Sequence, residues 1–162
     1  MTKFQVLLEI LHKEDILLRQ LLKLEKTKNS ILIDKDYNDL VPLSEKEEIL
    51  SAQLEDLEKE RILFSKSEDL PLNLADIINT TEINQEIHTK LREIQYTLVE
   101  NLKTLKFYNN LNNKILSESI NFFKSSLELL TGANDSNVYD NEGLQANMRF
   151  KKTQALMLDK TI

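Results

Sequence analysis

The two histidines, His12 and His88, are the side chains of this sequence best suited to metal binding or proton transfer. Neither has a second histidine close to it in the sequence, and the sequence has no cysteine. A di-metal site in a helical bundle requires a Glu-x-x-His pair on each of two helices. The residue three positions before His88 is Gln85. We therefore expect neither a metal site nor a bound cofactor.

Motifs for phosphate binding and for nucleophilic catalysis do not occur in the sequence. It has no H-E-x-x-H, no P-loop, no G-x-G-x-x-G and no nucleophile elbow. With two glycines in 162 residues, a glycine-rich phosphate loop is almost excluded. The 27 Asp and Glu residues fall mainly between the apolar positions of helical patterns, and we expect them on solvated faces. The sequence therefore predicts a protein that is not an enzyme.

The composition is typical of an amphipathic, all-α protein of one domain. Apolar residues make up 41% of the chain and charged residues 30%, and only two Gly and two Pro leave few turns for a sheet. The N-terminus has no signal-peptide pattern, and the lack of cysteine is compatible with the cytoplasm. Acidic residues exceed basic ones up to residue 144, which disfavours nucleic acid as a partner.

A long helix over residues 81–131 organises the rest of the chain. From Glu82 onwards, apolar residues recur mostly at steps of three or four, namely at Ile87, Leu91, Ile94, Leu98, Leu102, Leu105, Tyr108, Ile115, Phe122, Leu127 and Leu130. Fifty helical residues form a rod of roughly 75 Å, so we expect this helix to lie against other long helices. Thr80 or Thr81 is the expected N-cap, and Gly132 the expected C-terminal stop.

Two helices over about 3–41 and 44–65 are expected to pack on it. Pro42 is expected to end the first, and a capping box of Ser44 and Glu47 to begin the second. Either a tight turn or a kink satisfies this join, and we favour the turn. Residues 73–79 could form one helical turn that docks on the bundle through Leu74, Ile77 and Ile78. The predicted fold is an elongated antiparallel bundle or coiled coil of three main helices, 3–41, 44–65 and 81–131.

Four asparagines interrupt the apolar pattern of the long helix, namely Asn109, Asn110, Asn112 and Asn113. Buried polar groups are rare, so we expect these side chains to face solvent. The alternative is that one or two of them lie in a helix–helix seam and fix its register.

The C-terminal region has a different pattern from the rest. Residues 132–144 are small, polar and acidic, which is typical of a linker, whereas residues 145–162 combine apolar residues with four basic ones and one acidic one. We predict that this tail binds a partner, through Tyr139, Gly143, Leu144, Met148, Phe150, Leu156, Met157 and Leu158. Three other interpretations remain: a fourth helix completing the bundle, a weak membrane-docking segment, and, for Tyr139 and Gly143, a simple linker turn.

The sequence resembles the FlgN family of flagellar export chaperones along nearly its whole length. In the first half the family pattern matches Leu17, Leu18, Leu21, Leu22, Ile31, Leu32, Asp36, Leu40, Lys46, Ile49, Leu50, Leu54, Leu57, Glu58 and Arg61. In the second half it matches Asn113, Leu116 and Ser119, and then the step from Tyr139 to Gly143.

The resemblance implies a non-enzymatic, cytoplasmic protein. A chaperone of this kind binds hook-associated proteins, prevents their premature assembly and delivers them to the flagellar export apparatus, and its C-terminal region is expected to hold the cargo. The competing hypothesis is a structural or adaptor coiled coil that oligomerises along its helices and has no secreted client. The pattern fits a single bundle, an antiparallel dimer and a trimer equally well.

Overall fold

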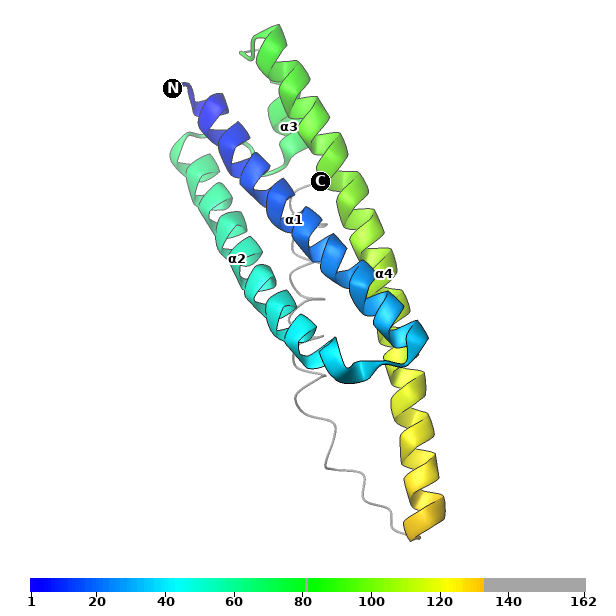
Figure 1. The fold of residues 1–162 in the computed structure, drawn as a ribbon. Coiled ribbons are helices and arrows are strands. Elements are labelled where there is room, and N and C mark those ends of the chain that lie inside the picture. The colour runs from blue at the N-terminus through cyan, green and yellow to red at the C-terminus, as the bar shows by residue number, and fades with distance from the viewer. Residues whose placement is uncertain (81, 133–162) are drawn as a thin grey trace.

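The computed structural model describes residues 1–80 and 82–132, and its regular structure in those ranges is helical throughout (Figure 1). The elements are α1 (Lys3–Asp34), a short 3-10 helix η1 (Tyr37–Asp39), α2 (Leu40–Ser67), α3 (Leu74–Ile78) and α4 (Gln85–Thr131). The expected all-α class is therefore confirmed for the described part of the chain.

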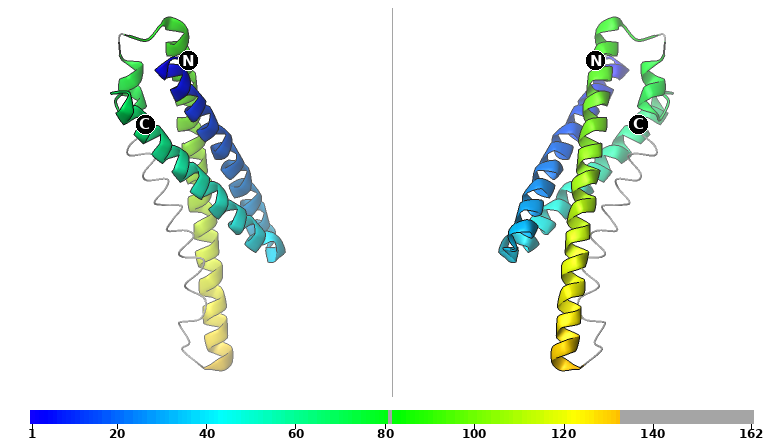
Figure 2. Two further views of the ribbon diagram at one scale, coloured as in Figure 1. Left: turned by 90° about the vertical axis from the view of Figure 1, so that its left-hand side faces the viewer. Right: turned by 90° about the vertical axis from the view of Figure 1, so that its right-hand side faces the viewer.

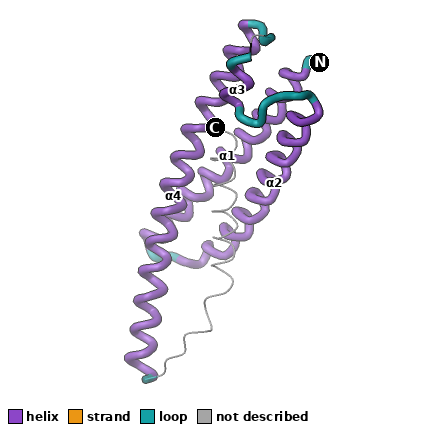
Figure 3. The backbone as a smooth tube through the Cα atoms, turned by 180° about the vertical axis from the view of Figure 1, so that it is seen from behind, coloured by secondary structure: helices purple, strands orange, loops and turns teal. Residues whose placement is uncertain are grey.

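The helix α1 lies between α2 and α4 and packs against both (Figures 1 and 3). The chain reverses at η1, so α2 runs antiparallel to α1. Between α1 and α4, Asp15 accepts a hydrogen bond from Asn101 and Glu25 accepts one from Asn112. Residue numbers thus increase together along both helices, so α4 is parallel to α1, and the return from α2 passes through α3.

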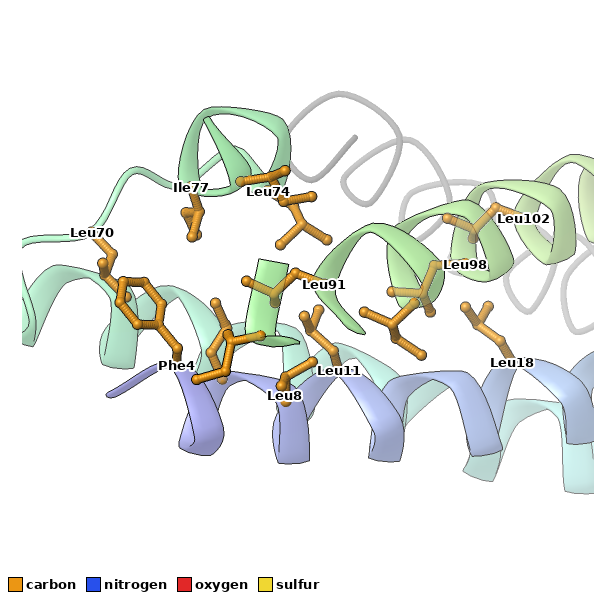
Figure 4. Close-up of a cluster of buried hydrophobic side chains, with 14 of the residues drawn as sticks. Phe4, Leu8, Leu11, Leu18, Leu70, Leu74, Ile77, Leu91, Leu98 and Leu102 are labelled. Atoms are coloured by element: carbon orange, nitrogen blue, oxygen red, sulfur yellow. The ribbon is translucent and has the colours of Figure 1, made fainter. Parts of the chain in front are cut away.

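The apolar core lies mainly between α1 and the first half of α4. Leu11 and Leu18 of α1 face Leu91, Leu98 and Leu102 of α4, and all five are buried (Figure 4). Their spacings of four and seven residues place each set on one helix face. Fully burying a leucine contributes about 1.5–3 kcal/mol, so this layer is a main source of the stability of the bundle.

The short helix α3 docks on the same core, as the sequence predicts. Leu74, Ile77 and Ile78 are buried, and the Asn73 side chain caps the helix by accepting a hydrogen bond from the backbone N–H of Ala75 at 2.8 Å (Figure 4). This docking brings the chain from the end of α2 to the start of α4.

The boundary between the first two helices differs from the prediction. α1 already ends at Asp34, where Lys35 adopts a left-handed conformation with φ 57°, and α2 already begins at Leu40. Pro42 therefore lies in the first turn of α2, where its missing N–H has no helical acceptor to lose. The Ser44 hydroxyl donates to the carbonyl of Leu40, so the predicted capping box is absent. The chain does turn between the two helices, but it does so at Lys35–Asp39 and not at the expected join, since residues 41–44 lie inside α2.

The ends of α4 are fixed by two local signals. Asn84 is the N-cap, and its side chain accepts a hydrogen bond from the Ile87 N–H at 2.9 Å, so the expectation of Thr80 or Thr81 was wrong. Gly132 ends the helix in a left-handed conformation with φ 65°, and its N–H donates to Glu128, as predicted. A left-handed residue after the last turn turns the chain away from the helix axis.

Replacing the N-cap tests this boundary directly. We expect Asn84→Ala to lower the free energy of unfolding by about 1 kcal/mol, because one backbone N–H of the first turn loses its acceptor. Asn84→Ser retains an acceptor and should stay within a few tenths of a kcal/mol of the wild type. Urea titration followed by circular dichroism measures both, and equal midpoints for the two variants would contradict the assignment.

Candidate partner-binding surface

The second half of α4 extends beyond the other helices. Asn112 is the last residue of α4 that is buried, and residues 113–131 project past the turn that joins α1 and α2 (Figures 1 and 2). At 1.5 Å per residue, this projecting segment is about 28 Å long. The expectation that the long helix lies against other long helices is therefore confirmed for its first half, which packs on α1, whereas residues 113–131 extend past the other described helices.

The projecting segment carries a group of exposed large apolar side chains, the tip residues, which are Ile120, Phe122, Phe123, Leu127, Leu129 and Leu130. Leu129 and Leu130 are 88% and 85% exposed. Single exposed apolar residues are common on protein surfaces, but six within eleven positions of one helix form a patch. Such patches are typical of binding sites for other proteins.

Four of the tip residues continue the buried stripe of α4. From Leu98, the stripe passes through Leu102 and Leu105, and then reaches Ile120, Phe123, Leu127 and Leu130 at helical spacing. The face that packs on α1 in the first half of α4 is thus the same face that no helix of residues 1–80 covers in the second half. Phe122 and Leu129, seven residues apart, lie on another side, where the Phe122 ring contacts Phe123 edge-on.

The charges of the projecting segment cancel. Lys114 and Lys124 are balanced by Glu118 and Glu128. A surface of this kind binds through apolar contact and shape rather than through attraction of an oppositely charged ligand. The partner that fits it best is an amphipathic helix, which buries an apolar stripe of the same spacing.

The eight site residues predicted from the sequence lie outside the described residues. They are Tyr139, Gly143, Leu144, Met148, Phe150, Leu156, Met157 and Leu158, and they stay a prediction. The sequence pattern places Phe122, Leu127 and Leu130 on the apolar face of the long helix, and it does not show that they are exposed. The lengths of the expected helices could have indicated the patch. The helices expected over about 3–41 and 44–65 are both shorter than the one expected over 81–131, so they cannot cover all of it.

A second feature, the seam between α1 and α2, contains buried charges. The Arg61 cluster, which comprises Glu14, Glu58 and Arg61, has a fully buried guanidinium that donates to both carboxylate oxygens of Glu58 at 2.9–3.0 Å. The same guanidinium donates to the Leu72 carbonyl at 3.1 Å and lies 3.5 Å from Glu14. Neither carboxyl oxygen of Glu14 has a hydrogen-bond partner.

The Lys28 cluster, which comprises Glu25, Lys28 and Glu47, lies farther along the same seam. The Lys28 ammonium lies 2.6 Å from Glu47 and 3.7 Å from Glu25. Asn112 of α4 donates to the Glu25 carboxylate at 2.7 Å and accepts a hydrogen bond from Asn29 at 2.9 Å. This cluster therefore connects all three long helices.

Burial raises the pKa of two carboxyl groups in these clusters. Desolvation is the largest effect on Glu14 and raises its pKa to about 8, against the attraction of Arg61 and with the repulsion of Glu58. Desolvation likewise raises the pKa of Glu47 above its ordinary value, although Lys28 favours the ionised form. Both groups therefore hold protons that an exposed glutamate would lose.

These clusters correct two sequence expectations. Glu14, Glu25, Glu47 and Glu58 are buried and do not lie on solvated faces. Of the four clustered asparagines, Asn109 and Asn112 are buried, so the alternative interpretation, a polar seam, is the correct one for them. Polar residues at seam positions restrict the register in which helices pair.

Within residues 1–80 and 82–132, no group of three or more His, Asp or Glu side chains is arranged to hold a metal ion. The helices described there also include none whose length and apolar content would let it span a bilayer.

Comparison with known proteins identifies one family. The family described as FlgN protein matches residues 1–147. The match covers the bundle and the projecting segment, and it ends inside the basic tail. No curated protein and no solved structure matches the chain.

Proposed function

Because this chain belongs to the FlgN family of flagellar export chaperones, we propose that it binds hook-associated proteins of the flagellum before their export. Its clients are the subunits of the junction between hook and filament. Binding in the cytoplasm keeps these subunits unassembled and brings them to the export apparatus. A chaperone of this kind needs an apolar surface that is free until a client arrives, and no catalytic group.

The observation that carries this proposal is the exposed apolar stripe of the projecting segment. Ile120, Phe123, Leu127 and Leu130 have the spacing of a helix–helix interface and lack a partner helix among the described residues. A helical terminus of a client that carries its own assembly surface would bury this stripe. While it is bound, the same terminus is unavailable for polymerisation.

We further propose the division of the chain that the sequence suggests. Residues 1–131 form the helical domain, residues 132–144 are a linker, and residues 145–162 are a basic, apolar segment that binds the client together with the projecting segment. Four basic residues against one acidic residue in 145–162 favour a client surface that is acidic. The projecting segment is neutral, so the two parts would recognise different features of the same client.

Two charge substitutions on the stripe test the client site. We expect Phe123→Asp/Leu127→Asp to lower the amount of hook-associated protein that co-purifies with the chain by at least about tenfold, because an apolar contact of this size contributes more than 1.4 kcal/mol. Both positions are exposed, so circular dichroism should show an unchanged fold. Co-purification from cells that express flagella, quantified by mass spectrometry, measures the effect.

The matched control places the same charges on the polar face of the same helix. Ser117→Asp/Ser125→Asp alters two exposed serines of the projecting segment and should retain wild-type recovery of the client. Equal recovery with both double variants would show that the stripe is not the client site. Failure to recover any secreted flagellar subunit with the wild type would contradict the proposed function itself.

A second candidate function is that of an adaptor that pairs with its own copies along α4, and the exposed stripe is compatible with it. An apolar helix face without a partner is the geometry that coiled-coil formation requires. Analytical ultracentrifugation distinguishes the two functions. A client-binding chaperone should dissociate from its own copies when the client is added, whereas an adaptor should remain self-associated and recover no client.

A further inference from the structure

The helix α2 is attached to the bundle in a different way from α4. Of the six residues of α2 that are buried, only Leu54 is apolar; the others are Glu47, Ser51, Glu58, Arg61 and Ser65. Six of the eight buried residues of α4 are leucine or isoleucine. Apolar burial is insensitive to protonation, whereas a buried polar seam is stable only when its charges are balanced. Leu50 and Phe64 of α2 also pack, partly buried, against the core. The attachment of α2 therefore combines this apolar contact with a buried seam whose strength depends on the state of its ionisable groups.

The two ends of α2 join chain segments of irregular backbone. Lys35 precedes it with φ 57°, and Asp69 follows it with φ 52°, and both are non-glycine residues in the left-handed region. Helix α2 thus begins and ends close to positions where the helical hydrogen-bond pattern is already broken. These positions allow α2 to move as a unit without breaking α1 or α4.

The charges of the seam do not balance when every group is ionised. Each cluster holds two carboxylates for one cation: Glu14 and Glu58 with Arg61, and Glu25 and Glu47 with Lys28. From α4, the neutral side-chain amide of Asn112 contacts the Lys28 cluster by donating a hydrogen bond to Glu25. One proton in each cluster would restore neutrality.

The oxygen atoms of the Arg61 cluster indicate where its proton is held. Arg61 is already bound to both oxygens of Glu58, whereas the two oxygens of the fully buried Glu14 lack a hydrogen-bond partner. A buried, ionised carboxylate without donors is strongly disfavoured, so Glu14 is the group that stays neutral. In the Lys28 cluster, Glu25 has the Asn112 donor. Glu47 receives a hydrogen bond from Lys28 alone among the described residues, so we assign the proton of this cluster to Glu47.

We propose that α2 is a proton-dependent latch on α1: it is closed while each of the two clusters holds one proton, and it opens when these protons are lost. Opening would uncover Leu54 and the face of α1 that carries Glu14 and Glu25. The latch is a property of the seam and does not depend on the identity of any client.

The direction of the pH effect follows from the raised pKa values. An open α2 exposes Glu14 to water, where its pKa returns to the ordinary value of 4.5, whereas in the closed state its pKa is about 8. Between these values the closed state binds more protons than the open one, so the latch weakens as pH rises. Glu47, whose pKa burial also raises, acts in the same direction.

Hydrogen exchange of the intact protein, measured by mass spectrometry at about pH 6 and about pH 8.5, tests the latch. Expressed as protection factors, which remove the intrinsic pH dependence of exchange, the protection of α2 amides should fall by at least about tenfold over this range. Amides in the first half of α4 should keep their protection. The variant Glu14→Gln/Glu47→Gln has neutral side chains of the same size and should remove the pH dependence of α2.

A matched control is Glu9→Gln/Glu60→Gln, which neutralises one exposed glutamate on each of α1 and α2 and should leave the wild-type profile unchanged. Three results would overturn the proposal: α2 protection that is constant between the two pH values, an equal loss of protection in α2 and α4, or a pH dependence that persists in the Glu14→Gln/Glu47→Gln variant. The first two results are read from the wild-type protein alone, so they decide the proposal even if the Glu14→Gln/Glu47→Gln variant does not fold.

Discussion

Replacing Arg61 by methionine should lower the free energy of unfolding by about 3–5 kcal/mol, which is a large part of the stability of a domain of this size. Methionine fills a similar volume but leaves the Glu58 carboxylate, beside the carboxyl group of Glu14, buried without a cation. It also removes the hydrogen bond to the Leu72 carbonyl, which ties the segment after α2 to the seam. Urea titration at about pH 7.5 measures the effect.

The control for Arg61→Met is Arg19→Met. Arg19 pairs with Asp15 at 2.8 Å, but its side chain is 63% exposed. Loss of an exposed pair costs at most about 1 kcal/mol. The variant Glu14→Gln/Glu58→Gln/Arg61→Met removes both carboxyl groups as well as the cation, and it should recover much of the lost stability. If Arg61→Met were no less stable than Arg19→Met, the Arg61 cluster would not be a buried ionic site.

Deletion of residues 145–162 should reduce client recovery to background and leave the bundle intact. The helical signal and the melting temperature should change little, because the described core is built from residues between Phe4 and Leu105. The expected loss is larger than that caused by substitutions on the projecting segment, since the deletion removes both the apolar and the basic residues of the tail. Co-purification with a hook-associated protein, in parallel with thermal melting, measures both properties.

A charge-reversed tail separates binding from folding. Lys151→Glu/Lys152→Glu retains the apolar residues of the tail and should weaken client binding less than the deletion, with a dependence on salt that differs from that of the wild type. A deletion variant that unfolds, or one that still recovers the client at wild-type level, would show that residues 145–162 belong to the bundle or are dispensable. Either result would remove the tail from the proposed site.

The apolar pattern predicted the helices well because it reports directly on burial. The stripe from Ile87 to Leu105 is buried as its spacing indicates, and Leu74, Ile77 and Ile78 dock where a single helical turn was expected. Gly132 ends α4 because a left-handed residue is required there. These features depend on local spacing and backbone chemistry, which one sequence contains.

The boundaries and the polar seam were less predictable because they depend on alternatives of similar energy. Proline is accepted in the first turn of a helix as well as after its end, so Pro42 was compatible with both positions. Glutamate in a helical pattern is usually solvated, and the burial of Glu14 becomes apparent only when Arg61 is placed opposite it. The pairing of two helices determines such contacts, and the spacing within either helix does not.

The candidate surface on α4 was not predicted, because the exposure of Phe123 and Leu127 could not be read from their spacing. The partner-binding residues that the sequence does predict, between Tyr139 and Leu158, lie outside the described residues and stay a prediction. The same stripe is buried in the first half of α4 and exposed in the second. The difference arises because α1 ends at Asp34 while α4 continues to Thr131.

The projecting segment separates the tip residues from the opposite end of the molecule, where the N-terminus, α3 and the start of α4 lie together (Figure 1). The 47 residues of α4 span about 70 Å. If a client binds at the tip residues as proposed, a second protein that contacts only the opposite end of α4 would not compete with it for those residues. Transfer of the client to the export apparatus could then begin with a ternary complex.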